Sequence, residues 1–160
     1  MIKWARLVAS SGVTVLHAHC VLKRYKKHSD KHSLNERLKT LHHYCKKLCD
    51  GGLRVRFIIR GAENVPEGQT FFIGNHCSLI DPVLFYALID KPSTVVAKKE
   101  INKMPFIGDV IKSVDGFFLD RGNLRKELKT FMDINKKLEE NKDLSILIYP
   151  EGTRSKAPDF

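Results

Sequence analysis

The chain has 160 residues, 42% of them hydrophobic, which is enough for one ordinary domain with a real core and too short for two of typical size. Its net charge of +10 belongs to the first third: residues 1–60 hold 14 Lys and Arg against 3 acids, and residues 61–160 hold 14 against 15. Such a segment suits an anionic surface, either lipid headgroups or nucleic acid phosphates. The four cysteines form neither a C-x-x-C pair nor a dense scaffold, which indicates a reducing, cytosolic compartment.

The first predicted element is a largely apolar stretch, residues 7–22, that polar residues dilute. A spanning helix needs about 20 predominantly apolar residues, so the composition favours an interfacial anchor over a full span. More positive charge follows the stretch than precedes it, which predicts that the following domain stays on the cytoplasmic face. The alternative is a buried helix of the soluble domain, because apolar runs of this length are common in cores.

A second helix is predicted to start at residues 33–36, where the sequence SLNE forms a capping box. In such a box the hydroxyl and the carboxylate each satisfy a free amide of the first turn. Apolar residues then recur at helical spacing until Gly51 and Gly52, which supply a stop. We therefore expect residues 1–50 to form a helical pair that associates with a membrane.

The remainder, residues 53–160, is predicted to be an α/β domain. Apolar and polar residues alternate with a period of two at residues 53–60, which predicts a strand near a sheet edge with one face exposed to solvent. Short buried strands are expected at residues 70–73, 93–97, 117–119 and 145–149, and helices at residues 81–89, 104–114 and 124–141. This alternation predicts a mixed, mostly parallel sheet flanked by helices, with ligands at the carboxyl ends of the strands.

His76 and Asp81 follow the strand predicted at residues 70–73. If the chain turns between them, the imidazole and the carboxylate come within hydrogen-bond reach. A neutral imidazole can then take a proton from a substrate hydroxyl, and the carboxylate fixes its tautomer. Asp81 also precedes Pro82 and could cap a helix through the amide of Val83 or Leu84; its two oxygens allow both roles.

Two other segments follow predicted strands and carry arginine. The sequence EGTR at residues 151–154 combines a glycine that permits close approach, amides that can form an anion-binding nest, and a side chain that matches phosphate. Its alternative is an exposed loop with a solvated arginine. Arg121 could likewise bind a phosphate, and its alternative is a surface ion pair with Asp120.

Together these segments resemble the phosphate acyltransferase family that includes the 1-acyl-glycerol-3-phosphate acyltransferases. Residues 75–81 (NHCSLID) look like its first motif, residues 118–121 (FLDR) like the end of its second, and residues 150–155 (PEGTRS) like its third. Residues 97–100 and 105–108 also look like the stretch between the first two motifs. The order and spacing of three motifs make chance agreement improbable.

Two departures from the family pattern matter. In the second motif a glycine normally stands three residues before the phenylalanine, whereas Asp115 occupies that place and Gly116 follows it. The chain also stops at Phe160, before the fourth motif and its strand. We therefore expect a truncated chain whose sheet is incomplete at its C-terminal end.

The resemblance implies a membrane-associated enzyme of phospholipid biosynthesis. It would move a fatty acyl group from a thioester of coenzyme A or acyl carrier protein to the free hydroxyl of a lysophosphatidate-type acceptor. No resident cofactor or metal is expected, and the partners would be an anionic phospholipid membrane, the lysophospholipid acceptor and the acyl donor, with no nucleic acid.

The expected roles of the residues follow from both arguments. His76 would act as general base and Asp81 would orient it, while backbone amides at residues 82–84 would stabilise the oxyanion. The acceptor's phosphate would be held by a larger set of residues: Arg121, Glu151, Gly152, Thr153 and Arg154, with Lys98 and Lys99 as further candidates.

Three other functions remain open at this stage. Cys77 and Ser78 beside His76 allow a nucleophilic lipid hydrolase, although Cys77 points away in an extended loop and no G-x-S-x-G elbow exists. The chain could also be a noncatalytic module that binds a membrane or nucleic acid. A zinc site could use His42, His43, Cys45 and Cys49, but cysteines on an apolar helical stripe are more often small buried hydrophobes.

Overall fold

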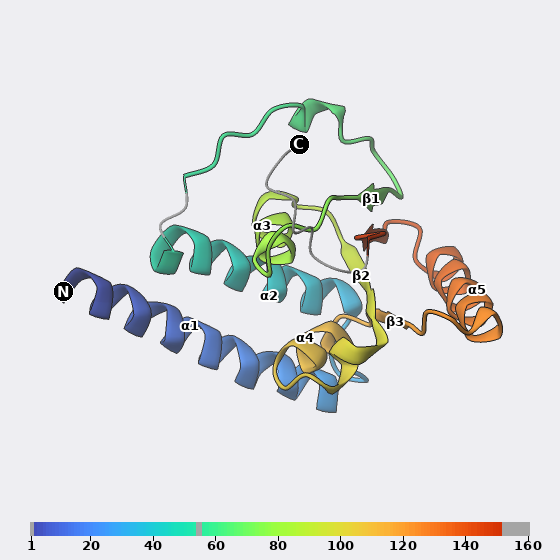
Figure 1. Ribbon diagram of the computed structural model, residues 1–160, viewed down its shortest axis with the longest axis horizontal. Coiled ribbons are helices and arrows are strands. Elements are labelled where there is room, and N and C mark those ends of the chain that lie inside the picture. Colours follow the sequence, from blue (N-terminus) through green and yellow to red (C-terminus); the bar gives the residue numbers. More distant parts are fainter. Residues whose placement is uncertain (1, 54–55, 152–160) are drawn as a thin grey trace.

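The computed structural model describes residues 2–53 and 56–151, which form an α/β fold (Figure 1). Five α-helices and four strands follow one another along the chain: α1 (Ile2–Lys27), α2 (Leu34–Lys47), β1 (Phe71–Ile73), α3 (Asp81–Leu88), β2 (Ser93–Lys98), α4 (Ile107–Ser113), β3 (Phe117–Leu119), α5 (Leu124–Glu140) and β4 (Ser145–Ile148). A π-helical turn (Leu48–Leu53) and two 3-10 helices (Ala62–Asn64 and Lys99–Lys103) connect some of them.

The four strands form one parallel sheet in the order β1-β4-β2-β3. Because every described strand runs the same way, all four carboxyl ends meet at one edge of the sheet. The central strands β2 and β4 are almost completely buried, as expected for parallel strands that helices cover on both faces. The predicted α/β class and the predicted positions of these four strands are confirmed.

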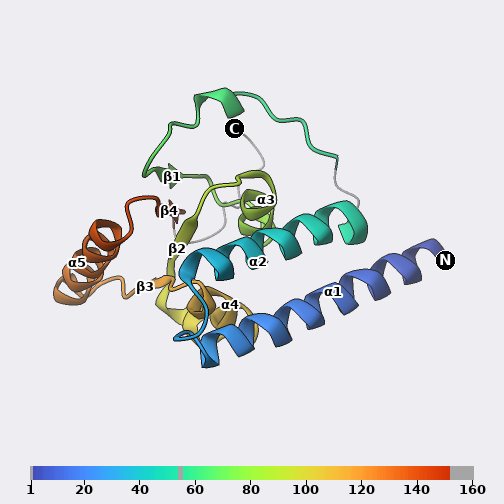
Figure 2. The same cartoon turned by 180° about the vertical axis from the view of Figure 1, so that it is seen from behind.

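Helices cover the two faces of the sheet unequally. α1 to α4 lie on one face, and α5 alone lies on the other (Figures 1 and 2). On the first face, Val95 and Leu147 pack with Ile111 of α4. On the second, Val96 and Ile146 pack with Ile134 of α5. Each central strand therefore sends alternate side chains into two apolar layers.

The helical pair packs into the same core as α3. Ser33 caps α2 as predicted, since its hydroxyl accepts from the Glu36 amide at 3.2 Å, whereas the Glu36 carboxylate contacts the His32 ring. Cys45 and Cys49 lie among leucines of α1 and α2, where burial, reinforced by the nearby Cys49, raises the pKa of Cys45 to about 12. These cysteines are thus part of the hydrophobic core.

α1 has one packed face and one exposed face. Leu22 is 1% exposed in the core, and Lys26 reaches Asp109 of α4 at 2.7 Å. On the outer face Val13 and Leu16 are 70% and 65% exposed. No helix within the described residues is both long and apolar enough to cross a bilayer.

The prediction of a strand at residues 53–60 is wrong for those of its residues that the structure describes. Residues 54–55 lie outside the described residues, and residues 56–60 have no strand conformation, with Ile58 80% exposed. A segment with alternating side chains does not form a strand unless a neighbouring strand accepts the hydrogen bonds of its backbone.

The prediction that β1 is buried is also wrong. β1 lies at the edge of the sheet, where Phe71 and Ile73 are 54% and 71% exposed.

Asp115 adopts a backbone conformation that suits glycine, with φ of 52°. Asp is among the few residues that tolerate this left-handed region. Its carboxylate receives Arg37 of α2 at 2.7 Å and Lys137 of α5 at 2.7 Å, and Arg37 also donates to the Ser113 carbonyl. Asp115 thus adopts the conformation of this turn and joins helices from both faces of the sheet.

Asp115→Asn should reduce the free energy of unfolding at neutral pH by about 2 kcal/mol, because it leaves the buried Arg37 without its anion. Asparagine tolerates the same φ, so the change isolates the charge. Burial raises the pKa of Asp115, but hydrogen bonds from Arg37 and Lys137 outweigh it and hold the pKa below the ordinary 3.8. The stabilisation is therefore present above that pH and lost as pH falls through the lowered pKa.

Urea unfolding of the wild type and the variant across a pH series measures this difference. The two curves should converge in acid. Asp133→Asn, which changes an exposed carboxylate of α5, is the matched control and should change stability little at any pH. A constant gap between wild type and Asp115→Asn down to the lowest pH would contradict the charge argument.

Candidate active site

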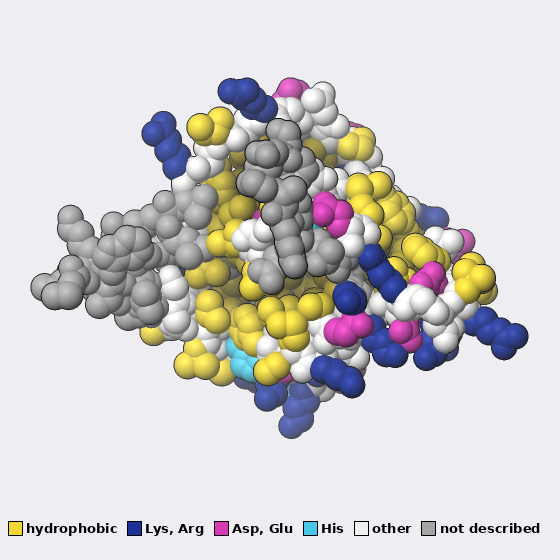
Figure 3. Space-filling model, in the orientation of Figure 1, with side chains coloured by type: hydrophobic (Ala, Val, Ile, Leu, Met, Phe, Trp, Pro, Cys, Tyr) yellow, Lys and Arg dark blue, Asp and Glu magenta, His cyan; other side chains and the backbone are white. Residues whose placement is uncertain are grey.

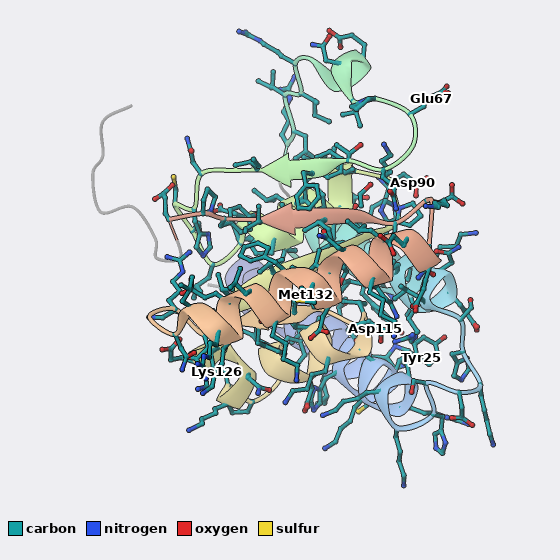
Figure 4. The ribbon with its side chains drawn as sticks, turned by 90° about the vertical axis from the view of Figure 1, so that its right-hand side faces the viewer. Tyr25, Glu67, Asp90, Asp115, Lys126 and Met132 are labelled. Carbon is teal, nitrogen blue, oxygen red and sulfur yellow. The ribbon has the colours of Figure 1, made fainter. Side chains whose placement is uncertain are left out.

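The carboxyl edge of the sheet gathers loops from all four strands. β1 leads into the loop at residues 74–80, β2 into Lys99, β3 into Asp120 and Arg121, and β4 into Tyr149 and the residues after it. Figure 4 shows β1 and β4 running side by side toward this edge. The parallel topology therefore brings together segments that are far apart in the sequence. The candidate ligand site was predicted at these carboxyl ends of the strands.

His76 and Asp81 form a hydrogen-bonded pair. The Nδ1 atom of His76 lies 3.0 Å from Oδ2 of Asp81, and the two side chains are 19% and 20% exposed. The same carboxylate oxygen accepts the backbone amides of Cys77 at 2.8 Å and Ser78 at 2.7 Å. The tight turn between the two residues thus folds around the carboxylate.

Asp81 does not cap α3. It is the first residue of the helix, and Ile80 occupies the capping position without a side-chain hydrogen bond. Pro82 follows in the first turn, where its missing amide costs nothing. The helix start therefore places the Asp81 carboxylate back over the preceding loop, where His76 lies.

The electrostatics of this pair favour an ionised carboxylate. Burial raises the pKa of Asp81, but the hydrogen bonds from the Ser78 amide, the His76 ring and the Cys77 amide together lower it below its usual value. An ionised carboxylate only accepts hydrogen bonds, so Nδ1 of His76 must carry the proton. Nε2 is then the ring nitrogen with a free lone pair, as a general base requires.

Tyr149 packs against the imidazole ring of His76. Its ring stacks on His76 with centroids 4.7 Å apart and an interplanar angle of 28°. Gly74 makes this possible, because a Cβ atom there would lie 3.1 Å from the Tyr149 ring. Burial, and then the charge of Asp81, raise the pKa of Tyr149, so the phenol stays neutral. Tyr149 is not among the predicted site residues, although an aromatic side chain at the end of a predicted strand was a usable signal.

Glu151 connects the histidine loop to Arg121. Its carboxylate accepts the His76 backbone amide at 3.2 Å. Its own carbonyl, and that of Pro150, accept the Arg121 guanidinium at 3.0 and 2.7 Å. Arg121 therefore bonds to the loop after β4, and the alternative of a surface pair with Asp120 does not hold.

Of the remaining predicted site residues, some lie near Arg121 and others do not. Lys99 lies 2.8 Å from Asp120, beside Arg121, whereas Lys98 approaches Glu100 at 3.8 Å. Gly152, Thr153 and Arg154 lie outside the described residues. The described site thus unites His76, Asp81, Arg121 and Glu151 directly, with Lys99 next to them.

The sequence matches the family described as Acyltransferase over residues 56–160, more than half of the chain. The chain belongs to this acyltransferase family. No solved structure matches it significantly.

Several curated acyltransferases are similar to this chain. The 1-acyl-sn-glycerol-3-phosphate acyltransferase of Borreliella burgdorferi is 30% identical over 106 residues, which cover 66% of the chain and 42% of that protein. The proteins of the same name from Cocos nucifera and Saccharomyces cerevisiae are 35% and 33% identical over 61% and 65% of the chain, and 31% and 33% of their own lengths. The chain therefore spans less than half the length of these relatives.

Of the described residues beside His76, neither Cys77 nor Ser78 is hydrogen-bonded to the His76 ring in the way that an activated nucleophile requires. In the described part of the chain, no hydrogen bond joins the His76 ring to the thiol of Cys77 or to the hydroxyl of Ser78; the Ser78 hydroxyl instead accepts the Ile80 amide. Nor do residues 2–53 and 56–151 contain a group of three or more His, Cys, Asp or Glu that could hold a metal ion.

Most backbone amides near the start of α3 are hydrogen-bonded within the protein or absent. The Leu84 amide donates to the Ile80 carbonyl at 2.9 Å, and Pro82 has no amide hydrogen. The amides of Cys77 and Ser78 are committed to Asp81. Of the three residues expected to stabilise an oxyanion, Pro82 and Leu84 therefore have no free amide hydrogen for that role.

Proposed function

We propose that this chain carries the catalytic part of an acyltransferase that moves a fatty acyl group from a thioester to the free hydroxyl of a lysophosphatidate. The observation that carries the proposal is the His76–Asp81 pair at the carboxyl edge of the sheet, with Arg121 bonded to the adjacent loop. The names of the relatives supply the substrate class.

In the proposed reaction, Nε2 of His76 takes the proton of the acceptor hydroxyl as its oxygen attacks the thioester carbonyl carbon. A carbon–oxygen bond forms, the carbon–sulfur bond breaks, and the proton passes from His76 to the departing thiolate. Asp81 holds Nδ1 and stabilises the imidazolium while the proton rests on the ring. No acyl-enzyme intermediate is needed.

The acceptor's phosphate would lie on the arginine side of this edge. A guanidinium carries five N–H donors, and the two carbonyls leave Arg121 with capacity for a phosphate. We propose Gly152, Thr153 and Arg154 as further phosphate ligands, with Lys99 and then Lys98 as peripheral ones. Glu151 serves better as a positioning residue, because its carboxylate holds the His76 amide and would repel a phosphate.

We further propose that the chain works at the cytoplasmic face of an anionic phospholipid membrane. Lys23, Arg24 and Lys27 lie exposed at the end of α1, after the exposed Val13 and Leu16. In Figure 3, Lys and Arg side chains gather at the lower margin, where this end of α1 lies. An apolar face followed by basic residues suits an interfacial anchor.

The test is an assay with a radiolabelled acyl thioester, offered as the coenzyme A ester or on acyl carrier protein, together with lysophosphatidate. Labelled phosphatidate is the expected product. Labelled free fatty acid alone would indicate a hydrolase. Absence of any product, with intact vesicle binding, would favour the noncatalytic module.

Arg121→Lys should raise the KM for lysophosphatidate by about tenfold and leave the KM for the thioester nearly unchanged, because an ammonium cannot match phosphate bidentately. The matched control is Arg60→Lys, at an exposed position in the loop before β1, which should change neither constant. Initial rates at varied acceptor and varied donor separate the two. An equal rise in both KM values would show that Arg121 acts on loop structure instead of on the phosphate.

A further inference from the structure

α5 exposes an apolar stripe to solvent. Ile134, 1% exposed, packs against the sheet, yet four large apolar side chains on the adjacent strip of the helix are exposed: Leu124 at 70%, Leu128 at 55%, Phe131 at 44% and Met132 at 70%. Their spacing of three, four and seven residues places them on one continuous strip. The apolar face of this helix therefore divides into a packed half and an uncovered half.

β1 continues the uncovered surface. Phe71 pairs with Ile146 and Ile73 with Ile148, so these side chains point to the same face of the sheet as the residues that α5 covers. In Figure 4, α5 lies beside β4 on the side away from β1, and no described helix lies in front of β1. Phe71 and Ile73 consequently remain exposed beside the helix.

A basic row borders the stripe on its other side. Arg125, Lys129 and Lys136 are exposed, and their spacing of four and seven residues aligns them along the outer flank of α5. The first half of the helix, residues 124–132, holds three basic residues and one acid. In Figure 3, hydrophobic and dark blue side chains lie next to one another over α5.

From this pattern we propose that the exposed stripe of α5, together with β1, rests on an anionic lipid surface. Apolar side chains enter the acyl boundary of a bilayer, while Arg and Lys extend their charged ends to the phosphates. α5 begins at the carboxyl edge, where Lys126 bonds to Asp120 at 3.1 Å, one residue from Arg121. The start of the stripe therefore lies beside the catalytic edge, on the face of the sheet opposite α1 (Figures 1 and 2). Binding can be measured without turnover, so this proposal does not depend on the acyl-transfer activity.

The experiment is flotation of the full chain with vesicles of phosphatidylcholine, with and without phosphatidylglycerol. Wild type should partition onto the anionic vesicles. The double variant Leu128→Gln/Met132→Gln should lower the partition coefficient about tenfold, because two side chains no longer enter the bilayer. Its matched control is Ile58→Gln/Ile59→Gln, which changes two equally exposed apolar residues elsewhere and should change binding little.

A second pair of variants tests the charge. Lys129→Gln/Lys136→Gln should remove most of the preference for anionic over neutral vesicles, a loss of about tenfold. Lys39→Gln/Lys47→Gln, two exposed lysines on α2, should keep that preference. Circular dichroism of each variant verifies that the helices are intact.

Three results would overturn the proposal. One is a failure of wild type to bind anionic vesicles. Another is unchanged binding by Leu128→Gln/Met132→Gln, which would assign the membrane contact to the N-terminal helices. The third is a change of oligomeric state in that variant, measured by light scattering, with vesicle binding unaffected; the stripe would then be covered by protein.

Discussion

Replacing His76 with alanine should lower the rate of acyl transfer by about a thousandfold, the largest effect expected of any single substitution in the chain. In the proposed reaction the ring accepts the hydroxyl proton, since Nδ1 is held by Asp81 and Nε2 keeps its lone pair. The loss should fall on kcat, because the proposed substrate contacts lie on Arg121 and the loop after β4.

Two controls separate chemistry from folding. His43→Ala changes an exposed histidine on α2 and should leave the rate unchanged. The double variant His76→Ala/Asp81→Asn should be no slower than His76→Ala alone, because an orienting carboxylate has no function without the ring. Turnover of His76→Ala within a few fold of wild type, with thermal unfolding unchanged, would refute the role of general base.

Asp81→Asn should lower kcat by about a hundredfold while both KM values change little. The amide keeps the shape of the carboxylate, and its oxygen can still accept the Cys77 and Ser78 amides, so the loop should persist. The negative charge is lost, however, so the oxygen that accepts Nδ1–H no longer stabilises the imidazolium that forms during the reaction.

The pH dependence of stability gives an independent measurement on the same residue. Because the pKa of Asp81 lies below its ordinary 3.8, its charge stabilises the native state above that pH, and the benefit disappears as pH falls through the lowered value. Wild type and Asp81→Asn should therefore differ in unfolding free energy at neutral pH and converge in acid. A variant with normal kcat would show that the carboxylate only shapes the loop.

Local signals predicted most of the helices and strands well. Ser33 begins α2 because a hydroxyl cap acts within one turn, and Pro82 marks the start of α3 for the same local reason. The strands β2 and β4 were predictable because each contains a short apolar run, at residues 95–97 and 146–148, as is typical of strands buried on both faces.

Features that depend on distant partners were harder to predict. The alternation at residues 53–60 could not show whether a neighbouring strand would be available. The sequence predicted a helix at residues 124–141 but not which of its apolar side chains would pack on the sheet, as Ile134 does. Tyr149 packs on His76 from 73 positions away, and Glu151 reaches the His76 amide from 75, separations that no local pattern encodes.

The insertion of β4 between β1 and β2 has a consequence for the order in which the protein folds. β1 pairs only with β4 among the described strands, so the loop that holds His76 has no partner in the sheet until the last strand docks. Contacts between residues about 75 apart carry a large loop-closure cost and form late. During synthesis, the His76 loop should therefore stay unformed until residue 151 has left the ribosome, and the nascent chain should show no partial activity before then.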